Sequence, residues 1–160
     1  MSHLIVLAAP TVEGAYAMCA TLDARPAADL AGLRDVVVMV RREDNTVRVQ
    51  QALDLAGAGT LGGQVWGALA GLIFLRPWLG AAAAGMTRRL SCLFAGAGID
   101  DDFIRKLDAD IRPGRSALFV LVDDWEAGRA LPLPARYDGA ILHTTLPAAE
   151  EARLRAWPAQ

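Results

Sequence analysis

Short apolar runs in the first third of the chain predict the strands of a sheet. Residues 3–8 and 35–42 are apolar over most of their length, which is typical of strands buried within a sheet. Residues 46–53 alternate apolar and polar side chains, which predicts a hairpin partner with one solvated face. Between the first two runs, residues 12–23 carry apolar side chains at helical spacing, and Thr11 can cap that helix.

The last third of the chain repeats this alternation of helix and strand. Asp100 can cap a helix over residues 101–110, whose apolar side chains gather on one side. Its expected buried residues are Phe103, Ile104 and Leu107. Residues 116–122 form another continuous apolar strand, residues 140–146 a last strand, and residues 148–156 a short terminal helix.

This order of elements predicts an α+β fold, with a middle segment inserted into it. Without the insertion, the arrangement is the split βαβ, ferredoxin-like one, which covers one face of an antiparallel sheet with helices and leaves the other face free. Residues 1–54 and 100–160 would form the two halves of this α/β domain. Residues 55–99 would form a helical hairpin between them.

The middle segment differs from its flanks in charge and in glycine content. Its 45 residues carry only Arg76, Arg88 and Arg89 and no acid, and they hold 10 of the 15 glycines. An ordinary globular domain does not leave a segment of this length almost without charged residues. The segment is therefore predicted to be a structural unit of its own that packs differently from its flanks.

Glycines recur every fourth residue in the first half of the insertion. A glycine inside a helix costs about 1 kcal/mol relative to alanine, so four in register favour a helix face that another backbone approaches closely. A second small-residue helix over residues 78–90 would complete a glycine-zipper hairpin with residues 59–71. The expected interface residues are Gly59, Gly63, Gly67, Gly71, Gly80 and Ala84.

The sequence allows this hairpin to lie in a lipid bilayer or to pack against protein. Residues 55–75 are 21 uncharged residues, about 30 Å of helix, which is long enough to span a bilayer core. The return leg contains Arg88 and Arg89, which are costly at the bilayer centre. The alternatives are a membrane-associated hairpin, a hairpin packed between subunits of a soluble assembly, and a core hairpin of a monomer.

Composition narrows the class of protein. The 160-residue chain is 54% hydrophobic with a net charge of -2, which excludes a disordered chain and argues against nucleic acid as a partner. Cys19 and Cys92 form no CxxC pair, and the apolar run at residues 4–9 is too short for a signal peptide. We expect a cytoplasmic protein that is not secreted, with association with the inner face of the cytoplasmic membrane as an open alternative.

Few residues of the chain are candidates for catalysis or for metal binding. His3 and His143 could meet across a sheet as two metal ligands, but no cysteine or carboxylate spacing completes a site. The acidic run Asp100–Asp102 is better explained as a helix cap with favourable helix-dipole charges. No acid/base or nucleophile constellation is present, so we expect no catalytic residue, no metal and no cofactor.

Several motifs together resemble a known bacterial family. They are Leu55-Ala56-Gly57-Ala58-Gly59, Leu61-Gly62-Gly63, Trp66-Gly67 and Gly71, then Gly98-Ile99-Asp100-Asp101-Asp102-Phe103, and Pro113-Gly114 before Ser116–Val122. The chain resembles the family called domain of unknown function 1269, whose members are labelled predicted membrane proteins. The resemblance implies a membrane location and supplies no activity or cofactor. The chain departs from the family pattern at Arg88-Arg89, where the second apolar leg would usually be uncharged.

The sequence favours a non-enzymatic protein that associates with copies of itself through the glycine-zipper hairpin. The alternative is a soluble oligomeric ferredoxin-like module that binds a regulatory or small ligand on its open sheet face. An enzyme is the least supported hypothesis, because no catalytic constellation can be assembled from the residues.

Overall fold

A computed structural model describes residues 2–24, 33–44, 46–53, 63–70, 92, 94–96, 98–122, 141–147, 149 and 152–153. Its elements are β1 (Ser2–Ala9), α1 (Gly14–Asp23), β2 (Leu33–Arg41), β3 (Val47–Leu53), α2 (Gly63–Ala70), α4 (Asp101–Asp110), β4 (Arg115–Val122) and β5 (Ile141–Leu146). The five strands predicted from the apolar runs are confirmed, as are the helices flanking the insertion. Of the predicted terminal helix, residues 149 and 152–153 are helical and the others lie outside the described residues.

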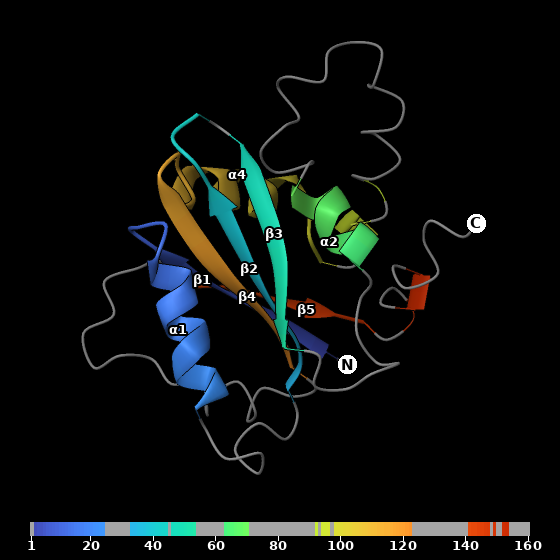
Figure 1. Cartoon of the computed structure of the whole chain (residues 1–160). Coiled ribbons are helices and arrows are strands. Elements are labelled where there is room, and N and C mark those ends of the chain that lie inside the picture. The colour runs from blue at the N-terminus through green and yellow to red at the C-terminus, as the bar shows by residue number, and fades with distance from the viewer. Residues whose placement is uncertain are drawn as a thin grey trace.

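The strands form one antiparallel five-stranded sheet in the order β3-β2-β4-β1-β5 (Figure 1). The central strand β4 pairs with β2 on one side and with β1 on the other, so that Val120 lies opposite both Val36 and Ile5. β1 and β2, which are joined through α1, therefore flank a strand from much later in the chain. This places the first and last thirds of the sequence in one sheet.

Helices cover both faces of this sheet, so the expectation of a free face is wrong. One face packs against Ala15, Met18 and Leu22 of α1, and the other against residues of α2 and α4. Figure 1 shows α1 and α4 on opposite sides of the sheet. The physical reason is that successive residues of β1, β2 and β4 are nearly all apolar. Because strand side chains alternate between faces, both faces need cover.

The start of α1 is stabilised by a side chain from β4 rather than by Thr11. Glu13 occupies the N-cap position and makes no side-chain capping hydrogen bond. Instead, the buried Ser116 hydroxyl accepts a hydrogen bond from the Ala15 amide (3.1 Å) and donates one to the Thr11 carbonyl (2.6 Å). The predicted Thr11 cap is therefore wrong, because a hydroxyl from the sheet supplies the acceptor that the helix start needs.

We expect Ser116→Ala to destabilise the fold by about 1–2 kcal/mol, the usual range for loss of a helix cap. Both bonds of the hydroxyl disappear, and the Ala15 amide is left buried without this acceptor. Urea unfolding followed by circular dichroism measures the loss. Thr21→Ala is the control, since its hydroxyl is exposed and bonds only one turn back within α1. A Ser116→Ala loss no larger than that of the control would contradict this account.

Candidate functional site

Helix α2 is anchored to the sheet by a buried tryptophan. Trp66 is 1% exposed, and its indole Nε1–H donates to Oδ2 of Asp35, which is 0% exposed, over 2.8 Å. Its ring also meets Phe119 of β4 edge-to-face, with centroids 6.0 Å apart. A buried carboxylate is costly without donors. The indole N–H therefore fixes both the position and the rotation of α2.

The apolar side of α2 is used inside this fold. Leu69 and Ala70 are buried with Trp66 in the same core cluster as Val37 and Phe119 of the sheet. These residues lie within the uncharged stretch 55–75, which is long enough to span a bilayer. Within the part of the chain that the structure describes, no helix is long and apolar enough to cross a membrane.

Gly67, one of the predicted interface residues, lies on an exposed part of α2. Beyond its own helix, no described atom lies within 4 Å of the position a Cβ would take there. Gly63 is the first residue of α2. Gly59, Gly71, Gly80 and Ala84 lie outside the described residues, so the stripe can be followed only at Gly63 and Gly67. The described residues therefore leave the Cβ position of Gly67 open.

The end of the insertion is fastened to the edge strand β5. Phe94 and Ile99 are buried in the core cluster that holds Trp66. Gly98 has a φ of 85°, and its carbonyl accepts a 2.7 Å hydrogen bond from the Thr144 hydroxyl. The described residues at both ends of the insertion thus pack on the same face of the sheet.

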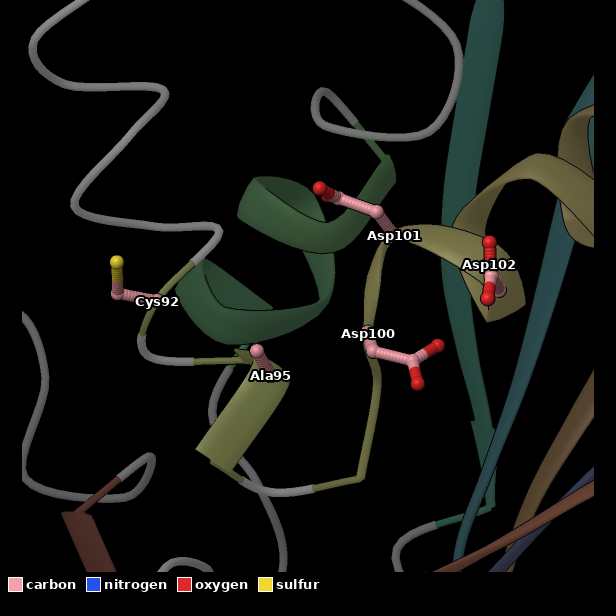
Figure 2. A pocket seen from close by; sticks show the side chains of 5 residues that line it. All are labelled: Cys92, Ala95, Asp100, Asp101 and Asp102. Carbon is pink, nitrogen blue, oxygen red and sulfur yellow. The ribbon is translucent and has the colours of Figure 1, made fainter.

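A shallow open pocket of about 320 Å³ lies beside the start of α4 (Figure 2). It is lined by Cys92, Ala95, Asp100, Asp101 and Asp102. In Figure 2 the carboxylates and the thiol point in different directions rather than at one point. Asp100 caps α4, since its Oδ1 accepts from the Phe103 amide over 2.9 Å, as predicted. Among the described residues, no three His, Cys, Asp or Glu side chains are grouped to hold a metal.

The two histidines meet across β1 and β5. His3 Nδ1 lies 3.0 Å from His143 Nε2, and the rings stack with centroids 5.1 Å apart. The strand register places His3 opposite Thr145 and His143 opposite Ile5, which makes the histidines diagonal neighbours on one face. Partial burial lowers the pKa of His143, and the nearby His3 lowers it further. The neutral imidazole is therefore favoured at this position.

The comparison with known families agrees with the resemblance that the motifs indicated. The family described as "Protein of unknown function (DUF1269)" matches residues 60–157. The chain belongs to this family. The DUF1269 match begins just before α2 and extends beyond β5, so it includes Trp66, α4 and β4. No curated protein and no solved structure matches the chain.

Two side chains that organise this DUF1269 protein could not be recognised from the sequence. Asp35 directly precedes the apolar run of β2, and Ser116 directly precedes the apolar run of β4. Both side chains form hydrogen bonds with residues at least 31 positions away in the chain. A local sequence pattern cannot predict such bonds.

Proposed function

We propose that this protein is a non-enzymatic, self-associating α/β protein whose helix α2 packs against α2 of other copies. The observation that carries the proposal is the orientation of α2. Trp66 and Leu69 lie against the sheet, while Gly67 lies on the exposed side with open space at its Cβ position. A helix held this way presents its backbone to a neighbour.

The glycine itself supports a close partner. Because an alanine Cβ at Gly67 would meet no described atom beyond its own helix, packing against the described residues does not require glycine there. Alanine would also be favoured by about 1 kcal/mol in a helix. Close approach of another helix backbone gives a reason to retain glycine.

Packing between subunits is favoured over insertion of α2 into lipid. Trp66 and Leu69 contribute to the core beneath the sheet, so the same side chains do not also face acyl chains. We place the assembly in the cytoplasm, where the rest of the hairpin could meet the inner face of the cytoplasmic membrane. The alternative of ligand binding on an open sheet face is not favoured, since described helices lie on both faces.

The proposed fold type is an elaborated ferredoxin-like arrangement. The unit β1-α1-β2 with β4 between its strands supports it, because this is the split βαβ connection. Strand β3 extends one edge of the sheet, and α2 and α4 add a helical layer on the face opposite α1.

The test is Gly67→Leu, measured by light scattering and native mass spectrometry. We expect the wild type to form a multiple of the 17.0 kDa chain and the variant to shift to the single chain. A leucine at Gly67 blocks close helix contact, and its Cβ would meet no described atom beyond its own helix, so circular dichroism should be unchanged. Ala109→Leu, which places the same side chain on the exposed side of α4, should leave the mass of the assembly unaltered.

Two outcomes would overturn the proposal. A monomeric wild type, or an assembly of equal mass in Gly67→Leu, would show that α2 does not mediate association. Retention of the wild type on membranes after a carbonate wash, with no assembly in the soluble fraction, would identify lipid as the partner instead.

A further inference from the structure

We propose that His3 and His143 form a chelating site for a Cu²⁺- or Ni²⁺-type ion on the face of the β1–β5 pair that also carries Ile5 and Leu7. The two facing nitrogens, His3 Nδ1 and His143 Nε2, come from strands that pair directly in the sheet. The sheet therefore fixes the distance between the two Cα atoms. Only side-chain rotation is needed to bring both lone pairs onto one ion.

The metal-free contact already holds the two nitrogens near the spacing that one ion needs. His3 Nδ1 and His143 Nε2 lie 3.0 Å apart, which is a hydrogen-bond distance. With metal–imidazole bonds of about 2.0–2.1 Å, two ligands of one ion lie about 2.9 Å apart at a right angle and about 3.4 Å apart at the tetrahedral angle, so a small rotation of the rings reaches either spacing. Tetragonal coordination by nitrogen and oxygen is typical of Cu²⁺ and Ni²⁺, and Cu²⁺ binds such sites more tightly than Zn²⁺.

A neutral imidazole is the form that binds metal. In the metal-free contact between two neutral rings, one ring donates its N–H to the other. That ring must adopt the tautomer with the proton on its other nitrogen before both facing nitrogens can bind one ion.

Water is expected to complete the coordination. The described residues supply no third His, Cys, Asp or Glu ligand at this pair, and His143 is exposed. The Thr145 hydroxyl lies 3.5 Å from His3 Nδ1, close enough to hydrogen-bond a metal-bound water after a small shift. The bound ion would join the edge strand β5 to β1 and would therefore stabilise the folded chain.

The experiment is a Ni²⁺ titration of the full chain at pH 7.5, followed by calorimetry and thermal unfolding. We expect one ion per chain and a rise in Tm of roughly 5–10 °C at one hundred times the Kd. Zn²⁺ should bind more weakly. His143→Asn should abolish both signals while leaving the residues around His3 unchanged, and Cys92→Ser should retain them.

Two results of this titration would contradict the proposed metal site. Equal Ni²⁺ binding by His143→Asn would place the ion elsewhere, and the absence of saturable binding by the wild type would also overturn the site. If His143→Asn does not fold, paramagnetic broadening by Cu²⁺ in the wild type decides. Broadening of the ring signals of both His3 and His143 supports the site, and broadening of one ring alone contradicts it.

Discussion

Trp66→Ala is expected to destabilise the folded chain by about 3–5 kcal/mol, the usual cost of removing a large buried aromatic side chain. The substitution empties the space between α2 and Phe119 and removes the donor that meets Asp35 at 2.8 Å. Asp35 is 0% exposed, so water cannot readily replace that donor. Urea unfolding monitored by circular dichroism measures the loss.

A second variant separates the hydrogen bond from the bulk of the ring. Trp66→Phe keeps an aromatic side chain and removes the indole N–H, and should cost about 1–3 kcal/mol. Ile141→Ala is the control for loss of an exposed apolar side chain, and it should change stability by less than about 0.5 kcal/mol, because Ile141 is 50% exposed. A Trp66→Ala loss as small as that of the control would mean that α2 does not unfold together with the sheet.

The strands were predictable from the sequence because their apolar runs are long and uninterrupted. The same apolar runs also indicate that both faces of the sheet are covered, contrary to the expected free face. Residues Val36–Val40 are apolar at every position, whereas β3 alternates Val47 and Val49 with the exposed Arg48 and Gln50. Alternation indicates one solvated face and its absence indicates two covered faces. The expected free face therefore applied to the edge of the sheet and not to its centre.

Local signals predicted α4 correctly in its bounds, its cap and its buried residues. The Asp100 side chain lies next to the amide that it caps, and Phe103, Ile104 and Leu107 follow helical spacing. Helix α1 lacked such information because Ser116, which satisfies its start, lies on β4, about one hundred residues later in the chain. A nearby hydroxyl such as that of Thr11 is then the natural prediction for the cap. Only the tertiary structure shows that the Ser116 oxygen reaches the Ala15 amide instead.

The predicted glycine interface stays a prediction, because the described residues include only Gly63 and Gly67 of it. Within α2, Gly67 is exposed and Leu69 is buried. The length of the uncharged stretch suggested a bilayer span, and hydropathy alone cannot tell a lipid-facing tryptophan from one that donates to a buried acid. The identity of that acid, Asp35, depends on a contact between β2 and α2.

The second large effect is expected at Gly98, where alanine should cost roughly 2–4 kcal/mol. Gly98 has a φ of 85°, a conformation that disfavours any residue with a Cβ. A Cβ there would also lie 2.5 Å from the Thr145 carbonyl oxygen and 2.7 Å from the Thr144 hydroxyl oxygen. Because the nearer atom belongs to the backbone of β5, relief requires the strand or the turn to move, which would break the Thr144–Gly98 hydrogen bond.

Gly114→Ala provides the matched control for this prediction. Gly114 has nearly the same φ, 84°, but among the described residues a Cβ there would meet the flexible Glu43 side chain alone, at 3.4 Å. Its cost should be limited to the backbone conformation, about 1–2 kcal/mol. The difference between the two variants in urea unfolding then isolates the contact between the end of the insertion and β5. Equal losses would show that this turn does not press on β5, and that the insertion is held to the sheet mainly through Trp66 and Phe94.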